Sequence, residues 1–249
     1  MKKDIEETIE HFIPSEGLYV ETYINKSLAS NPSPKEERLK KQAIHHLARY
    51  HWAARVLKNS PPGRVLDIAC GAGYGSFILA QTLPNHTIIG GDYDIRAVEY
   101  ANKTYCSYNL AYENLDVVTW KHVTNDKHMG NFDYIVSFDT IEHLFHREIA
   151  LVNFSEFLEK NGMLLFSTPC GRRENLLNPG WEHHKIEYSF KYLYNIMKRF
   201  YKDVMIPDNN SLPELDYWKD IINKDEQRYL LRANPMVCKN PISHTLGWF

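Results

Sequence analysis

The sequence predicts a doubly wound α/β fold with a mainly parallel sheet of seven strands, preceded by an N-terminal helical extension. Short apolar runs alternate with helical stretches after Gly63, as a parallel sheet with crossover helices requires. A glycine-rich turn, with Gly71, Gly73 and Gly75, follows the first apolar run. Open parallel sheets bind ligands at this place. With 249 residues, of which 43% are hydrophobic, the chain can bury one large core.

Two parts of the chain differ in pattern. We expect residues 1–60 to form a helical extension or lid and residues 61–249 to form the main domain, with an insertion near residues 207–227. Ser33 and Pro34 are typical of a helix start. Apolar side chains then keep a helical period up to Lys58, before a Pro-Pro-Gly sequence. The extension therefore contributes one long helix ahead of the first strand.

The main domain is predicted to alternate strands and helices. The apolar runs that predict strands are Val65–Ala69, Thr87–Gly91, Asp116–Thr119, Tyr134–Phe138 and Met163–Thr168. Helical stretches lie at Gly75–Leu83, Asp94–Tyr105, Arg147–Lys160 and Ser189–Arg199. A further strand at Tyr201–Ile206 and a late antiparallel strand around Tyr229–Lys239 complete the predicted sheet.

Composition narrows the class of protein. The 29 basic and 31 acidic residues leave a net charge of −2, which argues against a nucleic-acid partner or an anionic membrane. No apolar stretch approaches the length of a spanning helix, and the first residues lack the apolar core of a signal peptide. Four cysteines without paired spacing fit neither a disulfide framework nor structural zinc. We expect a cytoplasmic protein, and a homodimer is left open.

The glycine turn and two acidic residues predict a nucleoside ligand. Glycine permits positive φ and a close approach of ligand to backbone. Asp92 ends the second predicted strand about 21 positions after Gly71, the separation expected for an acid that binds ribose hydroxyls. Asp67, on the first strand, would repel a pyrophosphate but attract an ammonium group. The ligand predicted is a nucleoside that carries an amino acid.

Four segments resemble the motifs of class I S-adenosylmethionine-dependent methyltransferases. Val65–Ser76 resembles their first motif, Ile89–Ala101 their second-strand motif, Phe132–Leu144 their fourth and Gly162–Pro169 their fifth strand. The likeness covers residues 45–206 and keeps the order of the motifs. It implies S-adenosyl-L-methionine as the cofactor and the Rossmann-like methyltransferase fold.

The resemblance also implies a cofactor site. Asp67, Gly71 and Gly73 would surround the methionine part, Asp92 would bind the ribose, and Tyr93 would lie against the adenine. Ala69 and Phe138 would belong to the same cofactor site. Ala69 stands where many similar enzymes have glycine. The adenine edge stays open between Val118 and Asn125. Arg49 and Tyr50 resemble a segment that approaches the cofactor carboxylate, although an exposed arginine is an equal alternative.

The acceptor side requires a group that can remove a proton. Methyl transfer is an in-line displacement, so a poorly acidic hydroxyl acceptor needs a base or a metal. Glu142 and His143 follow the fourth predicted strand, and His184 follows the fifth. We therefore predict His143, His184 and Glu142 as the catalytic residues.

The same residues form a candidate metal set. Asp139, Glu142 and His143 have spacing i, i+3, i+4 and would share one face of a helix. Together with His184 they would suit Mg²⁺ or Mn²⁺. The run resembles the Glu-x-x-Glu-His metal motif of ubiquinone-pathway O-methyltransferases and small-RNA 2′-O-methyltransferases, with aspartate replacing the first glutamate. Glycan and lipopolysaccharide methyltransferases that are not known as metal enzymes also carry Glu-His-Leu here, which would leave His143 as an acid, a base or an acceptor-orienting residue.

The predicted function is O-methylation of a sugar, a surface glycan or another small polar metabolite, within polysaccharide or natural-product biosynthesis. One alternative is a metal-dependent RNA 2′-O-methyltransferase, against which neutral charge and the lack of an added RNA-binding domain count. An N-methyltransferase of an amino sugar is a second alternative, and a nucleoside-binding module that has lost catalysis is a third. The sequence does not name the acceptor.

Overall fold

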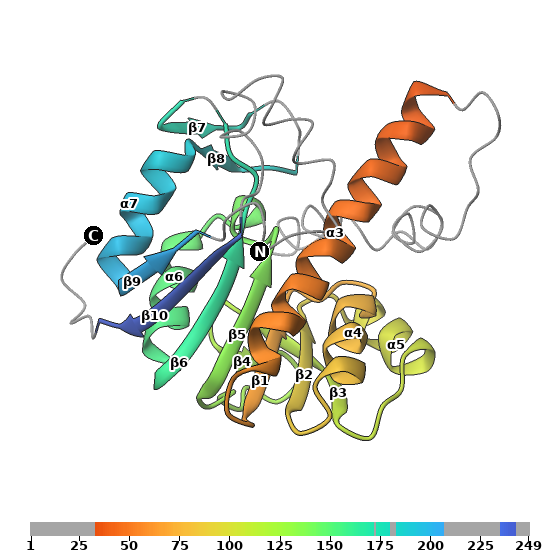
Figure 1. The fold of residues 1–249 in the computed structure, drawn as a ribbon. Helices are drawn as coiled ribbons and strands as arrows, with labels where there is room; N and C mark the ends of the chain where they lie inside the picture. Colours follow the sequence, from red (N-terminus) through yellow and green to blue (C-terminus); the bar gives the residue numbers. More distant parts are fainter. Residues whose placement is uncertain (1–32, 172, 180–182, 207–234, 243–249) are drawn as a thin grey trace.

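The computed structural model describes residues 33–171, 173–179, 183–206 and 235–242. Within them, one sheet has the strand order β4-β3-β2-β1-β5-β6-β10-β9, and helices cover both of its faces (Figure 1). The predicted insertion at residues 207–227 and most of the N-terminal extension lie outside the described residues. The doubly wound, mainly parallel fold predicted from the sequence is confirmed.

Five strands run parallel and bring their carboxyl ends to one edge of the sheet. They are β1 (Arg64–Ile68), β2 (Thr87–Asp92), β3 (Leu110–Asp116), β5 (Phe132–Phe138) and β6 (Leu158–Ser167). β10 (Met236–Pro241) is antiparallel to both β6 and β9 (Tyr201–Met205), and β4 (Lys121–His122) adds a short antiparallel edge strand. A separate hairpin pairs β7 (Asn175–Leu177) with β8 (Ile186–Tyr188). The candidate site lies at the shared edge, as the parallel arrangement requires.

The third strand is the clearest correction to the predicted elements. The apolar run predicts it at Asp116–Thr119, but β3 ends at Asp116. The strand carries polar residues such as Glu113 and Asn114, and its burial is uneven along its length. Its neighbour on the outer side is only the two-residue β4. A strand near the sheet edge is not buried on both faces, so it lacks the continuous apolar run by which buried parallel strands are detected.

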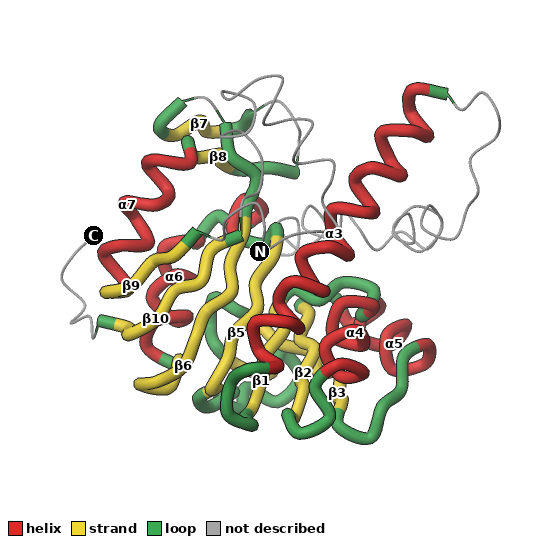
Figure 2. The backbone as a smooth tube through the Cα atoms, in the orientation of Figure 1, coloured by secondary structure: helices red, strands yellow, loops and turns green. Residues whose placement is uncertain are grey.

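Five described helices connect or precede the strands. They are α3 (Pro34–Lys58), α4 (Tyr74–Thr82), α5 (Ile95–Thr104), α6 (Arg147–Glu156) and α7 (Phe190–Phe200). Ser33 begins α3 with a capping box, and the Asp94 and Ser189 side chains cap α5 and α7. α6 ends four residues before the predicted Lys160, because β6 already begins at Leu158. Figure 2 shows how these helices flank the sheet.

The two faces of the sheet have separate cores. α3 and α4 pack on one face, where Trp52, Leu57 and Leu79 meet Val65 and Val136. α6 and α7 pack on the other face, against residues that include Leu66 and Ile135. Successive side chains of a strand point to opposite faces. Asp67 therefore lies on the same face as Val65, beneath α3.

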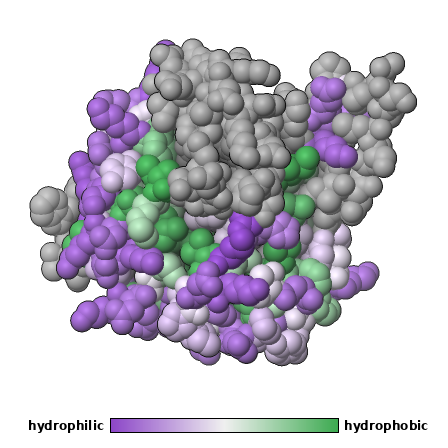
Figure 3. All heavy atoms as spheres, viewed as in Figure 1, coloured by the Kyte–Doolittle hydropathy of each residue, from purple (hydrophilic) through white to green (hydrophobic). Residues whose placement is uncertain are grey.

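Among the described residues, no helix is both long and apolar enough to cross a bilayer. Hydrophilic residues cover most of the described surface visible in Figure 3, with apolar residues exposed in small areas between them.

Candidate active site

The turn after β1 has the backbone conformation that its glycines predict. Ala69, Gly71 and Gly73 all have positive φ, at 62°, 56° and 90°. No described atom lies within 4 Å of the position that a Cβ on Gly71 would occupy, so this glycine faces open space that a ligand can enter. A Cβ on Gly73 would lie 2.6 Å from the Cβ of Ala101. The left-handed φ of Ala69 costs about 1 kcal/mol relative to glycine, which explains why similar enzymes have glycine there.

Asp67 is fully buried below this turn. Its carboxylate accepts hydrogen bonds from the Ser76 hydroxyl at 2.6 Å and from the Tyr50 hydroxyl at 3.1 Å. Burial raises the pKa of Asp67 to about 7, although the two hydroxyl donors act to lower it. Both carboxylate oxygens thus have a donor within the protein, and Asp67 acts on a ligand through its charge and through these hydroxyls.

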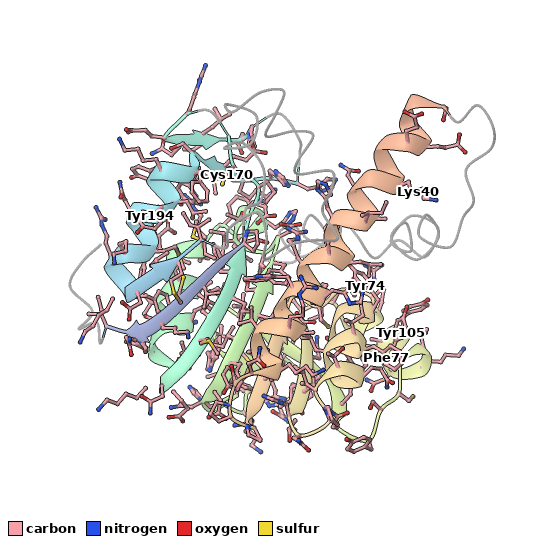
Figure 4. All side chains as sticks on the ribbon, viewed as in Figure 1. Lys40, Tyr74, Phe77, Tyr105, Cys170 and Tyr194 are labelled. Carbon is pink, nitrogen blue, oxygen red and sulfur yellow. The ribbon has the colours of Figure 1, made fainter. Side chains whose placement is uncertain are left out.

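Tyr50 forms a wall of the turn from α3. A Cβ on Gly75 would lie 2.1 Å from the ring of Tyr50, so glycine is required for α3 to approach α4 this closely. The Tyr50 ring also makes edge contacts with Tyr74, labelled in Figure 4, and with Phe138, at centroid distances of 5.7 and 5.3 Å. The structure therefore places the Phe138 side chain in the core beneath α3, also within 6.3 Å of the Trp52 ring.

Asp92 ends β2 beside the same turn. Its two oxygens accept backbone N–H groups from Gly71 at 2.8 Å and from Asp94 at 2.9 Å. Burial raises the pKa of Asp92 to about 6, against the effect of these N–H donors. The Asn114 amide donates to the carbonyl oxygens of Asp92 and Tyr93, and the Tyr93 side chain is 40% exposed. Asn114 thus fixes the backbone that presents both predicted ligand contacts.

Arg49 is buried, and its partner is Asp139. The guanidinium donates to both carboxylate oxygens of Asp139 and to the Ser167 hydroxyl at 3.0 Å, and His46 lies 3.6 Å from the same carboxylate. Burial acts to raise the pKa of Asp139, but Arg49 lowers it to about 2. The alternative of an exposed arginine is wrong, because only 4% of Arg49 is exposed.

The residues that follow β5 do not share one helical face. Asp139 has a φ of 53°, and only Ile141–His143 form a short 3₁₀ helix, η1. Asp139 therefore points to Arg49, and it is not in the group of possible metal ligands formed by Glu142, His143 and His184. The spacing rule failed here because it assumes a continuous α-helix.

Glu142 lies in the interior at the start of the acceptor side. The carboxyl is 1% exposed, and its Oε2 accepts a hydrogen bond from the Thr168 hydroxyl at 2.7 Å. Its Oε1 lies 3.7 Å from His143 Nε2 and has no hydrogen-bond partner among the described residues. Burial, and then the charge of Asp139, raise the pKa of Glu142 well above its usual value.

The two histidines are oriented by acceptors on their Nδ1 atoms. His143 Nδ1 lies 3.1 Å from the carbonyl oxygen of His183, and His184 Nδ1 lies 2.9 Å from Glu187 Oε1. A carbonyl and a carboxylate only accept hydrogen bonds, so each neutral ring carries its proton on Nδ1 and its lone pair on Nε2. The ring centroids are 5.1 Å apart. The structure thus brings together His143 and His184, which are 41 positions apart in the sequence.

The match to a protein family indicates which nucleoside binds at the turn after β1. Residues 59–233, most of the chain, match the family model described as a methyltransferase domain. The chain belongs to the class I S-adenosylmethionine-dependent methyltransferases. The cradle fits the cofactor of this family, because the described residues leave space beside Gly71 and Asp92 presents a carboxylate there. The predicted cofactor, S-adenosylmethionine, is supported.

Curated relatives match parts of the methyltransferase. It is 33% identical over 109 residues to phosphoethanolamine N-methyltransferase 1 of Triticum aestivum, which is 43% of this chain and 21% of that protein. It is 28% identical over 168 residues to malonyl-(acyl-carrier protein) O-methyltransferase of Bacillus cytotoxicus, which is 65% of this chain and 54% of that protein. The match therefore spans much less than the full length of these relatives, and they include both N- and O-methyltransferases.

Solved structures share the fold of the methyltransferase. Magnesium protoporphyrin IX methyltransferase of Synechocystis PCC 6803 superposes with a TM-score of 0.58 at 12% identity, over 92% of this chain and 97% of that one. The O-methyltransferase of a trans-AT polyketide synthase multienzyme of Brevibacillus brevis gives 0.56 at 17% identity, over 84% and 77%. At these identities the likeness shows the fold alone.

Several site residues were not predicted from the sequence. Ser76 and Asn114 support the cofactor turn, and Thr168 donates to Glu142. Cys170, labelled in Figure 4 beside the β7–β8 hairpin, is buried, and burial followed by the charge of Glu142 raises the pKa of its thiol to about 12. A polar residue directly after an apolar strand was the available signal for Thr168. For Ser76 and Asn114 the sequence held no signal beyond residue type.

Proposed function

We propose that this chain transfers a methyl group from S-adenosylmethionine to a hydroxyl group of a sugar, a surface glycan or another small polar metabolite. The observation that carries the proposal is the His143 imidazole, whose Nδ1 donates to the His183 carbonyl so that Nε2 holds the basic lone pair. η1, which carries His143, follows β5, and β5 pairs directly with β1, which precedes the cofactor turn. A hydroxyl is weakly acidic and needs such a base.

The proposed reaction is an in-line displacement. The sulfonium supplies an electrophilic methyl group, and the electron pair of the broken carbon–sulfur bond stays on sulfur as a thioether. The acceptor oxygen forms the new bond to the methyl carbon and loses its proton to Nε2 of His143. The carboxylate of Glu187 holds the second imidazole, His184, in the same tautomer at 2.9 Å, so His184 orients the acceptor or relays the proton.

The cofactor side contributes binding and orientation. Each oxygen of Asp92 accepts one backbone N–H and keeps a further lone pair for the ribose hydroxyls. Gly71 and Gly73, with the backbone of Ala69, admit the methionine part, and the charge of Asp67 attracts its ammonium group. The exposed ring of Tyr93 is placed to lie against the adenine. The Phe138 side chain is in the core, where it packs against Tyr50 and Trp52, so Phe138 supports this site through Tyr50.

The N-terminal extension closes this site in our proposal. α3 supplies Tyr50, which donates to Asp67 and lies against Gly75. It also supplies Arg49, which binds Asp139 after β5. α3, the helix of this extension that the structure describes, is thus attached at both the cofactor side and the acceptor side.

N-methylation of an amine is the second candidate, because the matching relative from Triticum aestivum is a phosphoethanolamine N-methyltransferase. An amine has its own lone pair once it is deprotonated, so it depends less on His143. Labelled S-adenosylmethionine supplied with panels of sugars, nucleotide sugars and amines separates the candidates. We expect His143→Gln to lower kcat roughly 100-fold or more on a hydroxyl acceptor. Nitrogen methylation at an unchanged rate in His143→Gln would favour the second candidate.

The cofactor assignment has its own test. Asp92→Ala should weaken S-adenosylmethionine binding roughly 100-fold in calorimetry, because two charge-assisted hydrogen bonds to the ribose are lost. Asp126→Asn is the matched control, since Asp126 is exposed and pairs only with Lys121 among the described contacts. Equal affinity in Asp92→Ala and the control would remove the ribose assignment.

A further inference from the structure

We propose that Glu142, His143 and His184 bind one divalent transition-metal ion on the acceptor side of the site. One ligand atom of each residue lies within 4.8 Å of the others. Bonds of about 2.0–2.2 Å to nitrogen or oxygen place the ligands of one ion roughly 3–4 Å apart. Small side-chain rotations therefore bring the three atoms to bonding distance, and Asp139 is excluded from the set by its ion pair with Arg49.

Glu142 presents an oxygen to which none of the described residues donates a hydrogen bond. The Thr168 hydroxyl donates to Oε2, whereas Oε1 has no hydrogen-bond partner among the described residues and is directed toward His143 Nε2 at 3.7 Å. The side chain is 1% exposed. A buried carboxylate oxygen without a donor is costly, and a cation between Oε1 and the two imidazoles removes that cost.

The hydrogen bonds that His143, His184 and Glu142 make to neighbouring groups are of the kind that orient metal ligands in proteins. Ligating histidines commonly donate their second ring N–H to a carbonyl or a carboxylate, which fixes the tautomer. His143 does this with the His183 carbonyl, and His184 does it with Glu187. Thr168 holds the carboxylate in the same way. Each of the three residues therefore has an outer partner, and one ligand atom of each lies within 4.8 Å of the others.

The donor set changes the ion that the sequence predicted. Two carboxylates in the set favoured Mg²⁺ or Mn²⁺, but the structure leaves one carboxylate and two imidazoles. Imidazole nitrogen suits ions of the Mn²⁺ to Zn²⁺ series, whereas Mg²⁺ prefers oxygen ligands and keeps its waters. We infer a site that binds Mn²⁺, Co²⁺ or Zn²⁺ in preference to Mg²⁺.

The role of the ion rests on the proposed hydroxyl methylation, whereas its binding rests on the geometry alone. A divalent cation supplies Lewis acidity that makes a nearby hydroxyl more acidic. Nε2 of His143 cannot hold both an ion and a proton. With an ion bound, His143 and His184 would position the acceptor and its hydroxyl proton would pass to solvent water. The base role proposed above for His143 would then apply to the metal-free chain.

The test is a Co²⁺ titration of the full chain after chelator treatment and dialysis. We expect one Co²⁺ per chain, with the visible d–d absorption of a nitrogen- and oxygen-ligated ion. Glu142→Gln and His184→Gln should each weaken binding at least tenfold, and Glu187→Gln should weaken it roughly tenfold to 100-fold through the outer contact. His183→Ala is the matched control, since its part in the cluster is its backbone carbonyl, and it should bind as the wild type does.

Two results would overturn the metal site. One is binding below one equivalent, and the other is equal affinity in the wild type and Glu142→Gln, which would assign the Co²⁺ to other histidines among the 12 in the chain. Thermal unfolding of each variant in chelator shows whether it is folded. Calorimetry of S-adenosylmethionine on the metal-stripped chain keeps the two proposals apart. Cofactor binding without Co²⁺ binding rejects the metal site alone, and absent cofactor binding rejects the proposed function.

Discussion

Two buried carboxyl groups at the same edge of the sheet differ in how completely the protein satisfies them. Asp67, on the cofactor side, accepts a hydroxyl donor on each oxygen, from Tyr50 and Ser76. Glu142, on the acceptor side, accepts one donor from Thr168, and its Oε1 accepts none from the described residues. The protein therefore supplies a donor to each oxygen of Asp67, whereas the described residues leave one oxygen of Glu142 without a hydrogen bond.

The ion pair between Arg49 and Asp139 connects these two sides, and breaking it should have the largest effect. Arg49→Met leaves the Asp139 carboxylate without its partner, and we expect a loss of about 3 kcal/mol in the free energy of unfolding. Urea denaturation at neutral pH measures this loss. Asp139→Asn and the double variant complete a double-mutant cycle. A coupling near zero would show that α3 is not fastened through this pair.

The same pair predicts a pH dependence. The pKa of Asp139 is about 2 in the folded state against 3.8 in its ordinary environment, so its stabilisation is present above pH 4 and is lost as the pH falls from about 4 to 2. Arg49→Met should flatten the stability profile in this window. An unchanged slope in the variant would assign the acid sensitivity to other groups.

Removing the carboxyl group of Asp67, which has a donor on each oxygen, should have the next largest effect on stability. Asp67→Ala leaves the buried hydroxyls of Tyr50 and Ser76 without their acceptor, and we expect a loss of about 2 kcal/mol in stability. Tyr50→Phe and Ser76→Ala, which each leave one oxygen of Asp67 without a donor, should each cost about 1 kcal/mol. A cost for Asp67→Ala no greater than that of Tyr50→Phe or Ser76→Ala would contradict the view that both hydroxyls depend on Asp67 as their acceptor.

Replacing Glu142, whose Oε1 accepts no hydrogen bond from the described residues, should have the smallest effect on stability. Glu142→Gln keeps the shape and an acceptor for Thr168, so we expect stability in chelator to change by less than about 1 kcal/mol. The pKa of Glu142 is raised in the folded state, so the wild type loses stability as the pH rises above the ordinary glutamate pKa of 4.5. The variant does not titrate at this position, and its stability relative to the wild type should rise with pH. A loss of several kcal/mol would make Glu142 a structural residue like Asp67.

The elements that the sequence predicted well are those that are buried on both faces. β1, β2 and β5 follow continuous apolar runs, and the turn at Gly71 and Gly73 requires the positive φ that glycine allows. β3 was misplaced because its edge position leaves it polar. The hydrogen bonds of Asn114 to Asp92 and Tyr93 had no signal in the sequence. Local patterns report burial and backbone conformation but not which polar groups meet.

The sequence by itself determined the fold class, the cofactor turn and the acid at the end of β2, because these depend on short-range periodicity, on glycine conformation and on the meeting of parallel strand ends. Only the tertiary structure decided the partners on the acceptor side. Asp139, predicted to join Glu142 and His143, binds Arg49 from α3, and His184 lies against His143, from which it is 41 positions away in the sequence. Such pairings are set by the packing of α3 and the β7–β8 hairpin on the sheet edge. Residue spacing contains no information about contacts of that kind.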